Sequence, residues 1–469
     1  MRRRSLLAAP SLAVLLCACA RGKAEGLPST PCVLPGVPRE ARCSWLEVPE
    51  NPDAPAGRTL RLHLAVVGAT GIRPLPDPIF VLAGGPGQAA SEIAGSVLPL
   101  FASLEPRRDL VFVDQRGTGR SAPLACPDDL HRRPLAEAFD DEANAARLTA
   151  CRDAFTDAGV DLAQYATWIA MRDLEAARLA LGYGPVNLWG GSYGTRAALE
   201  FARQFPNSVR TVVLDGVAPA QQPLPVALAF DTDSVLDQVL AQTDGGLAEA
   251  LDVILAPDAG VATVTDPFFG GEVRLRLERK QRIGLLRGPL YAPMLSAALP
   301  EAISRAGAGD WSALVGLQAG LRGGRLYAGM HFSVLCAEDV PRISDDDRRA
   351  VASTRAGTTF IDEYERACRG WPTRPVPQAF FAPPTFSAPT LLLSGGRDPA
   401  TPPRNAEAVA RTLPGALHVV APRLGHGVSS AACAPRLVRD LVTRGAVAGL
   451  DGGCLGDLPA PTFFEAPRP

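Results

Sequence analysis

The feature that most constrains this chain is a series of short, continuously apolar runs, each followed within a few residues by glycine. Such runs are typical of parallel strands that are buried on both faces and alternate with helices. Two segments between the runs carry apolar residues at helical spacing. We therefore predict an α/β protein with parallel strands at 78–82, 110–113, 186–189, 211–214 and 390–393.

Two earlier segments extend the predicted sheet, and one long segment interrupts it. Residues 60–67 have a strand pattern, and 43–48 can pair with them as an antiparallel edge. Residues 218–385 are mostly helical in pattern and end in a proline-rich stretch. We predict a core in two parts, 28–217 and 386–469 with its C-terminal tail, and a mainly helical cap inserted at 218–385. Open α/β sheets bind ligands at the carboxyl ends of their strands, which this cap would cover.

The composition excludes two classes of protein. Hydrophobic residues make up 47% of the 469 residues and charged residues 20%, so the chain can bury a core and does not resemble a disordered protein. The net charge is −2, and the basic residues are spread along the chain. Nucleic acid is therefore not an expected partner.

The N-terminus has the pattern of an export signal over residues 1–19. Three arginines precede an apolar run at 6–16, which is too short to span a bilayer. Residues 16–19 resemble a bacterial lipobox, which would place a lipid on Cys19 and attach the protein to a membrane; the alternative is an ordinary cleavage site after small residues. We expect an exported protein, either periplasmic or anchored as a lipoprotein, and otherwise secreted.

Eight cysteines follow the signal, an even number in an oxidising compartment. None stands in a C-x-x-C or Cys/His cluster with zinc spacing, so we predict disulfides and no metal site; buried thiols are the alternative. The cysteines fall into neighbouring couples, and short loops are favoured by closure entropy. The predicted pairs are Cys32 with Cys43, Cys126 with Cys151, Cys336 with Cys368, and Cys433 with Cys454.

The segment Gly190-Gly191-Ser192-Tyr193-Gly194 is the G-x-S-x-G motif of this chain. It follows the predicted strand 186–189 and opens a helical segment, which is the setting of a nucleophile elbow. Small residues on either side of the serine let the strand and the helix approach closely. We predict that Ser192 is a nucleophile; a serine that only caps the helix is the alternative.

An acid and a base follow the serine in the order Ser, Asp, His. The strand 390–393 ends in a Gly-Gly turn that presents Asp398, and His426 lies between two glycines after a further apolar run. A serine hydroxyl needs a base to take its proton, and the acid orients that base and stabilises its charged form. We predict Ser192, Asp398 and His426 as a catalytic triad, although an Asp in such a turn is more often a turn former.

A catalytic serine also needs donors for the negative charge that develops on the substrate oxygen. The backbone N–H of Tyr193 is one candidate, and the loop 84–87, Gly-Gly-Pro-Gly, supplies the other through Gly85. A simple turn is the alternative interpretation of this loop. We interpret residues 114–121 as a turn in which Asp114 and Arg116 brace the glycine loop.

Together these motifs resemble the prolyl iminopeptidase and tripeptidyl aminopeptidase family of α/β hydrolases. The resemblance rests on the segments 84–87, 114–121, 190–194, 396–402 and 425–427. It departs at Ala83, where many prolyl iminopeptidases carry histidine; this favours the secreted tripeptidyl branch. The resemblance implies the α/β-hydrolase fold with a cap, release of proline or short peptides from free amino termini through an acyl-enzyme, and no cofactor. A carboxylesterase or lipase with the same triad, and an inactive binding protein on this scaffold, are the alternatives.

An enzyme that recognises a free amino terminus needs a carboxylate near the bound amine. The apolar run 331–337 in the predicted cap leads into Glu338 and Asp339. We predict Glu338 as an amine anchor, with Asp339 as the second candidate. A helix cap or a partner for an arginine such as Arg342 is the alternative.

Overall fold

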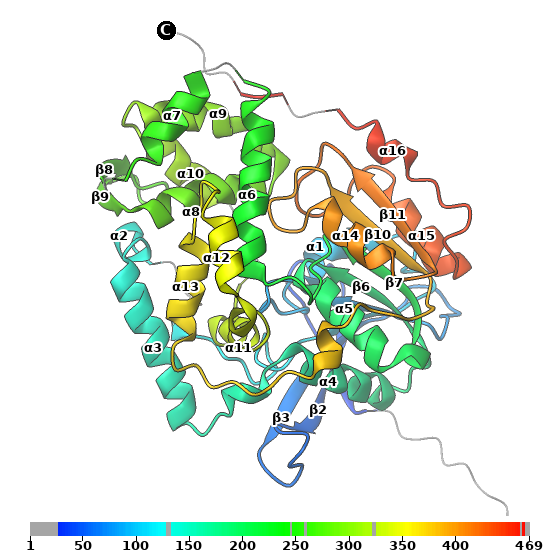
Figure 1. Cartoon of the computed structure of the whole chain (residues 1–469). Coiled ribbons are helices and arrows are strands. Elements are labelled where there is room, and N and C mark those ends of the chain that lie inside the picture. The colour runs from blue at the N-terminus through cyan, green and yellow to red at the C-terminus, as the bar shows by residue number, and fades with distance from the viewer. Residues whose placement is uncertain are drawn as a thin grey trace, which may run out of the picture.

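The computed structural model describes residues 27–127, 133–243, 246–257, 260–320, 325–459 and 462–464. The predicted export signal and Cys19 lie outside the described residues. In the described part, a nine-stranded sheet has the strand order β1-β2-β3-β5-β4-β6-β7-β10-β11 (Figure 1). The strands are β1 (Ser29–Cys32), β2 (Ala41–Pro49), β3 (Thr59–Val67), β4 (Ile79–Leu82), β5 (Leu110–Val113), β6 (Val186–Gly191), β7 (Val209–Asp215), β10 (Thr390–Gly395) and β11 (Ala416–Ala421).

The sheet changes character along its width. The pairs β1–β2, β2–β3 and β3–β5 are antiparallel, and every pair from β5 to β11 is parallel. The side chains of β4, β5, β7 and β10 alternate between two separate hydrophobic cores, one on each face. Both faces are therefore buried, which explains why these strands appear in the sequence as continuous apolar runs.

Helices cover each face of the sheet. One core includes α4 (Thr167–Ala180), α5 (Tyr193–Gln204) and α14 (Pro403–Ala410). The opposite core includes the short α1 (Ala94–Val97) and η1 (Leu98–Phe101), together with α15 (Ala434–Arg444) and α16 (Gly453–Gly456). The carboxyl ends of β6, β7 and β10 consequently meet at one edge of a rigid layer, where the loops of the candidate site begin.

The chain between β7 and β10 builds a second layer with its own hydrophobic core. Figure 1 shows its helices beside the sheet, close to α3 (Asp141–Asp157). A hairpin of two antiparallel strands, which the sequence pattern did not reveal, accompanies the helices. The elements are α6 (Leu224–Leu240), α7 (Gly246–Ile254), β8 (Gly260–Thr265), β9 (Glu272–Leu277), α8 (Arg279–Leu290), α9 (Pro293–Gly307), α10 (Ser312–Gly320), α11 (Ala328–Glu338), η5 (Val340–Arg342), α12 (Asp345–Val351), α13 (Thr359–Cys368) and η6 (Gln378–Phe381).

Two features connect this inserted layer to the core. Helix α11 places Met330 and Val334 in the hydrophobic core of the sheet layer. Helix α3 and the short α2 (Leu135–Ala138), which precede the nucleophile in the chain, contact α13 and β9 of the insertion. The predicted fold class is confirmed: a mostly parallel sheet with flanking helices and an insertion between β7 and β10.

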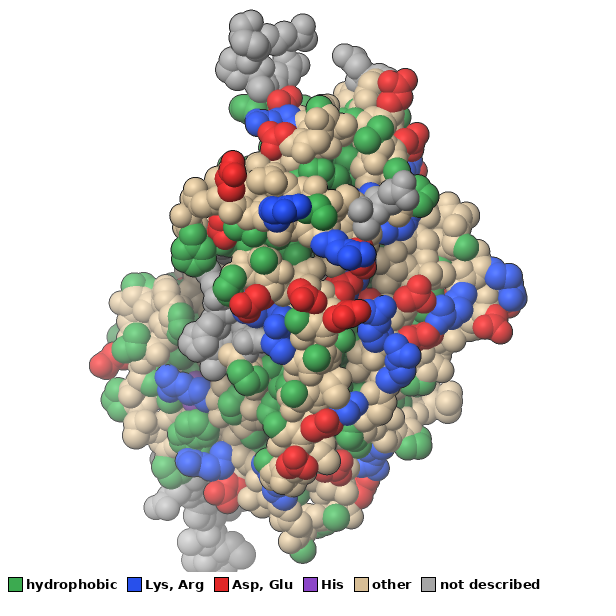
Figure 2. All heavy atoms as spheres, turned by 90° about the vertical axis from the view of Figure 1, so that its left-hand side faces the viewer, with side chains coloured by type: hydrophobic (Ala, Val, Ile, Leu, Met, Phe, Trp, Pro, Cys, Tyr) green, Lys and Arg blue, Asp and Glu red, His purple; other side chains and the backbone are tan. Residues whose placement is uncertain are grey.

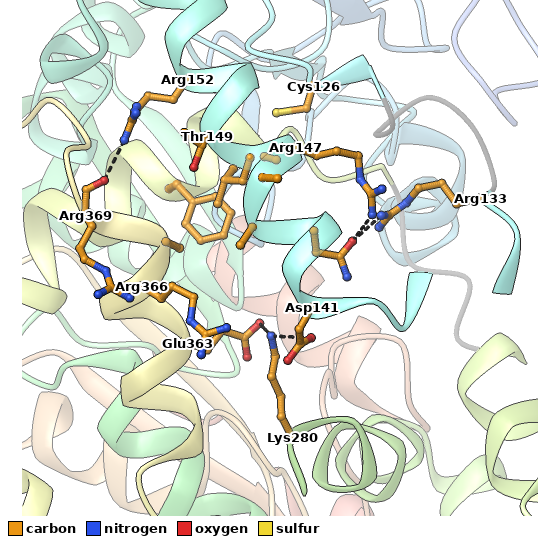
Figure 3. Close-up of a pocket in the computed structure, with 17 residues that line it drawn as sticks. Cys126, Arg133, Asp141, Arg147, Thr149, Arg152, Lys280, Glu363, Arg366 and Arg369 are labelled. Atoms are coloured by element: carbon orange, nitrogen blue, oxygen red, sulfur yellow. Dashed lines mark hydrogen bonds and ion pairs between the residues drawn. The ribbon is translucent and has the colours of Figure 1, made fainter. Parts of the chain in front are cut away.

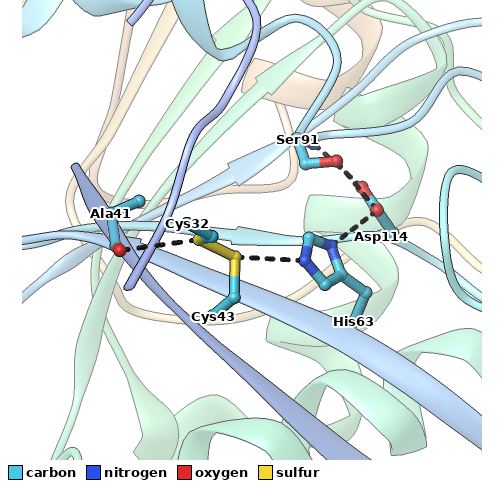
Figure 4. Close-up of a disulfide and its surroundings, with 6 residues drawn as sticks. All are labelled: Cys32, Ala41, Cys43, His63, Ser91 and Asp114. Atoms are coloured by element: carbon cyan, nitrogen blue, oxygen red, sulfur yellow. Dashed lines mark hydrogen bonds and ion pairs between the residues drawn. A yellow bond between two sulfur atoms is a disulfide. The ribbon is translucent and has the colours of Figure 1, made fainter. Parts of the chain in front are cut away.

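The structure contains all four predicted disulfides. They are Cys32–Cys43, Cys126–Cys151, Cys336–Cys368 and Cys433–Cys454. Cys336–Cys368 joins α11 to α13, and Cys433–Cys454 fixes the C-terminal segment to the start of α15. Figure 4 shows the first bond beside β2 and β3, where the Nε2 atom of His63 lies 3.2 Å from Cys43 Sγ.

The surface offers no single-sign charged face in the view of Figure 2. Acidic and basic side chains are interspersed on the face that the insertion and α3 present. Among the described helices, none combines the length and the hydropathy that crossing a membrane requires.

Candidate active site

Ser192 occupies the tight turn between β6 and α5. Its backbone angles are φ 56° and ψ −124°, a strained conformation for a residue with a side chain. A Cβ on Gly190 would lie 2.3 Å from the carbonyl oxygen of Gly194, and a Cβ on Gly194 would lie 2.1 Å from that of Leu82. Only glycine fits at both positions, so the motif is required for the strand and the helix to approach this closely.

The Ser192 side chain makes no capping hydrogen bond to α5, although the residue stands at the helix N-cap position. Ser192 is partly exposed, whereas Tyr193 and Gly194 are buried. The hydroxyl is therefore presented at the surface of the turn. The alternative interpretation, in which this serine only caps the helix, required a capping hydrogen bond that the structure does not have.

His426 and Asp398 lie side by side at the same edge of the sheet. The Nδ1 atom of His426 is 2.8 Å from Oδ2 of Asp398. Asp398 is buried and follows β10, and its Oδ1 accepts hydrogen bonds from the backbone N–H groups of Ala400 and Thr401, both at 2.9 Å. The side chain of His426 is 19% exposed, so part of the imidazole is accessible. The structure thus gives His426 an oriented and partly accessible ring.

The electrostatics of the pair follow from burial and from mutual attraction. Burial favours the neutral form of Asp398, but the charge of His426 and the hydrogen bonds from His426 and Thr401 outweigh it and lower the pKa of Asp398. Burial opposes protonation of His426, but the Asp398 carboxylate outweighs it and raises the pKa of His426 above its ordinary value. The carboxylate of Asp398 therefore stabilises the protonated form of His426. A histidine takes this form when it acts as a general base.

Thr401 and Asp215 were missed as site residues by the sequence analysis. The Thr401 hydroxyl donates to Oδ2 of Asp398 at 2.7 Å and lies 3.1 Å from Nδ1 of His426. Asp215, the last residue of β7, accepts hydrogen bonds from the N–H groups of Val428 and Ser429, both at 2.8 Å. The sequence did contain a signal for Asp215, which is an acid directly after the predicted strand 211–214 and before a glycine.

Gly216 allows the histidine loop to approach β7. Its φ is +71°, and a Cβ there would lie 2.7 Å from the Thr401 hydroxyl and 3.3 Å from Cε1 of His426. A side chain at this position would displace the imidazole. The ends of β7 and β10 therefore bring the histidine and the acid to the edge that carries Ser192.

The glycine loop lies against the nucleophile, as the sequence analysis expected. A Cβ on Gly84 would lie 3.3 Å from Cβ of Ser192. In the described structure, neither the Gly85 amide nor the Tyr193 amide donates a hydrogen bond to a protein acceptor. Both backbone N–H groups therefore lack an acceptor within the described protein. On its other side the loop contacts α11, where Nδ1 of His331 lies 2.9 Å from the carbonyl oxygen of Pro86.

Within the segment 114–121, Asp114 binds the part of the chain that follows the glycine loop. The Asp114 carboxylate accepts hydrogen bonds from the N–H and the hydroxyl of Ser91, which follows the glycine loop, and contacts His63 (Figure 4). Arg116 does not reach the loop, so that expectation was wrong. Its guanidinium turns to the other side and binds Asp173 of α4, because this carboxylate is buried beside it and would otherwise be unpaired.

Glu338 and Asp339 lie beneath the site as ionic partners of Arg196. Both acids are fully buried. Asp339 binds the Arg196 guanidinium through two hydrogen bonds of 2.8 and 3.1 Å, and Glu338 accepts from the N–H and hydroxyl of Thr167 at 2.6 and 2.9 Å. The Thr167 hydroxyl also contacts that of Tyr193 at 2.7 Å. A substrate amine would have to compete with Arg196, a residue that sequence reasoning did not connect to these acids.

A separate cavity of about 600 Å³ lies between α3 and α13 (Figure 3). None of the site residues predicted from the sequence lines it. At its rim Lys280 lies 3.2 Å from Asp141 and 3.1 Å from Glu363, so its ammonium is already paired. Among the described residues, no cluster of three or more His, Cys, Asp or Glu side chains has the arrangement of a metal site.

A serine at a strained turn between a strand and a helix, with an aligned His–Asp pair at the same sheet edge, defines a serine hydrolase. Sequence comparison gives the same class. Residues 77–429 match the profile of the α/β hydrolase fold family. The chain belongs to this family.

The relatives of the chain include both peptidases and esterases. It is 28% identical to serine protease Hip1 of Mycobacterium tuberculosis over 432 residues, which cover 81% of each chain. It is 30% identical to tripeptidyl aminopeptidase of Streptomyces lividans over 193 residues, which cover 39% of this chain and 36% of the relative. It is 27% identical to carboxylesterase B of Mycobacterium tuberculosis over 427 residues, which cover 80% and 78%. The crystal structure of proline iminopeptidase from Mycobacterium smegmatis aligns with a TM-score of 0.38 at 16% identity, over 86% of this chain and 97% of that one.

Proposed function

We propose that this chain is an exported serine aminopeptidase that releases proline or short peptides from free peptide amino termini. The observation that carries the proposal is the oriented His426–Asp398 pair at the sheet edge that presents Ser192. The similarity to serine protease Hip1 and to a tripeptidyl aminopeptidase supports a peptide as the substrate.

In the proposed mechanism, Ser192 Oγ attacks the carbonyl carbon of the scissile bond while His426 takes the hydroxyl proton. The oxygen of the attacked carbonyl becomes negatively charged in the tetrahedral intermediate, and it accepts hydrogen bonds from the backbone N–H groups of Gly85 and Tyr193. The C–N bond then breaks, and His426 gives its proton to the departing amine. Water, deprotonated by His426, then attacks the acyl carbon. The ester bond to Ser192 Oγ breaks, the acid is released, and His426 returns the proton to Ser192 Oγ, with Asp398 stabilising the imidazolium in both halves.

Export is proposed from chemistry at two places in the chain. The four disulfides are stable in an oxidising compartment. Residues 1–19 carry a basic cluster and a short apolar run, and Cys19 stands where a lipobox cysteine would be lipidated. Mass spectrometry of the mature N-terminus tests this, because a lipid on Cys19 and a plain cleaved terminus differ in mass.

A carboxylesterase is the second candidate, favoured by the similarity to carboxylesterase B over most of both chains. An ester needs the same nucleophile, base and oxyanion donors, so the triad does not separate the two reactions. The substrate contacts of the inserted layer decide between them.

The test measures kcat/KM of the purified protein on aminoacyl and tripeptidyl anilides, on their N-acetylated forms, and on short acyl esters. We expect turnover of free-amine anilides to exceed that of the blocked forms. A protein that hydrolyses only the esters would be the carboxylesterase. A serine-directed phosphonate should label Ser192 in either case, and labelling elsewhere would refute the assignment of the nucleophile.

A further inference from the structure

A cap arginine stands next to the histidine of the candidate triad. Arg287 lies on α8, one helical turn before Tyr291. The Tyr291 ring meets the His426 imidazole edge-on, with 5.1 Å between their centroids, and the Tyr291 carbonyl accepts the His426 backbone N–H at 3.1 Å. The end of α8 is therefore fixed onto the histidine loop, and Arg287 is fixed with it.

The Arg287 guanidinium lies close to two aromatic rings. Its Cζ lies 4.8 Å from the ring centroid of Tyr291 and 5.6 Å from that of Phe360, and Nη2 donates to the Tyr291 hydroxyl. Stacking on rings restricts the plane of a guanidinium and directs its N–H groups outward from the edge. The side chain is thus preorganised, and binding an anion would cost it little rotamer entropy.

Arg287 forms no ion pair within the described structure, in contrast to two buried arginines of the core. Arg116 pairs with Asp173, and Arg196 pairs with Asp339. Among the described residues, Arg287 forms no ion pair with Asp or Glu, its Nε is buried without a hydrogen-bond partner, and its Nη1 makes no hydrogen bond. The side chain is only half-buried, so part of it faces open space. An unpaired cation in such a place has donors available for an incoming anion.

We propose, building on the peptidase function proposed above, that Arg287 binds a carboxylate of the substrate on the leaving-group side of the scissile bond. His426 delivers its proton to the leaving group, so the part of the substrate nearest to His426 and Tyr291 is the departing amine. In a short peptide that part ends in the C-terminal carboxylate. The planar guanidinium can donate two N–H groups to such a carboxylate, and the enzyme then selects short peptides with a free C-terminus.

The experiment compares short peptides of graded length, each made with a C-terminal carboxylate and with a C-terminal carboxamide. For the wild-type protein we expect kcat/KM to be about 10-fold to 100-fold higher for the acid at the length that reaches Arg287, chiefly through KM. Arg287→Gln should abolish this preference, so that the ratio of kcat/KM for the acid to kcat/KM for the amide falls to about 1. Arg287→Lys, which keeps the charge without the planar fork, should keep part of the preference.

Arg349→Gln is the matched control, because Arg349 is an exposed arginine of the same inserted layer, 71% exposed in its side chain. It should retain the full preference. Equal losses on acid and amide in Arg287→Gln would make the guanidinium a structural group and overturn the proposal. So would a wild-type enzyme with no preference at any length, or a preference only for carboxylates on the acyl side.

The proposal about Arg287 remains testable if peptides are not substrates. Esters whose alcohol part carries either a carboxylate or a carboxamide provide the same comparison. Turnover of esters alone would refute the peptidase function, while the acid-to-amide ratio in the wild type and in Arg287→Gln would still decide the role of Arg287. Thermal unfolding of both variants shows whether a loss of activity reflects a loss of folded protein.

Discussion

The backbone N–H of Ser192 donates a hydrogen bond of 2.8 Å to the carbonyl oxygen of Asp215. The carboxylate of the same aspartate binds the N–H groups of Val428 and Ser429, just after His426. Asp215 therefore joins the serine turn and the histidine loop through one residue at the end of β7. The distance between nucleophile and base depends on this residue, although it touches neither reacting atom.

Asp215→Asn should lower kcat and weaken folding together. An amide can accept only one of the two backbone N–H bonds through its oxygen, and its NH₂ group opposes the other. We expect a loss of about 1–3 kcal/mol in the free energy of unfolding and a fall in kcat with little change in KM. Denaturant unfolding and steady-state kinetics measure both. Asp346→Asn, in an exposed acid of α12, is the control, and equal behaviour of the two variants would contradict the role of Asp215.

Ser192→Ala and His426→Ala should each remove nearly all turnover, about 10⁶-fold in kcat, because the triad acts as a unit. Asp398→Asn should cost about 10⁴-fold, since it disturbs the tautomer and orientation of the imidazole without removing it. Circular dichroism and unfolding curves establish that the variants are folded. Appreciable turnover by folded Ser192→Ala would refute the nucleophile.

The pH profile should report the His426–Asp398 pair. Only neutral His426 can take the serine proton, so kcat/KM should fall as the pH decreases through the pKa of His426. Asp398 raises that pKa above its ordinary value, so the acidic limb should lie at higher pH than it would for a free histidine. In Asp398→Asn burial still lowers the pKa and the counter-charge is gone, so the limb should move to lower pH. An unmoved limb would mean that another group titrates.

Glu338→Gln tests whether the buried acid holds a substrate amine or the protein. Burial raises the pKa of Glu338 to about 7 against the opposing charge of Arg196. Because its oxygens are bound to Thr167, we expect equal changes in KM for free-amine and N-acetylated substrates, together with reduced stability. A rise in KM confined to free-amine substrates would instead restore Glu338 as the amine anchor.

The sequence alone predicted β4, β5, β6, β7 and β10 of the parallel part of the sheet, because residues buried on both faces leave continuous apolar runs. Strand β11, at the partly exposed edge, was not among the predicted strands. It also predicted the four disulfides, because each pair closes a short loop. The strained turn at Ser192 was visible in advance, since only glycine fits at 190 and 194. Asp398 and His426 were recognisable from the order of the motifs, although their catalytic roles stay predictions.

Other features depended on contacts between segments far apart in the chain. The ionic partner of Glu338 and Asp339 is Arg196, more than a hundred residues away, and the nearby Arg342 was the only candidate that local sequence suggested. Arg116 turned toward Asp173 because a buried carboxylate there needed a cation. Likewise, nothing in the sequence around Arg287 or Tyr291 indicated that α8 ends against His426.

The difference between the features that the sequence predicted and those that it did not has a physical cause. Strand burial, turn strain and loop closure act on neighbouring residues, so they leave local patterns that one sequence reveals. Ion pairing and ring stacking satisfy whichever partner the fold brings within a few ångströms, and that partner carries no mark in the sequence. The sequence therefore determined the sheet, the nucleophile turn and the disulfides, and only the tertiary structure decided which acids are paired and which cation is left for a substrate.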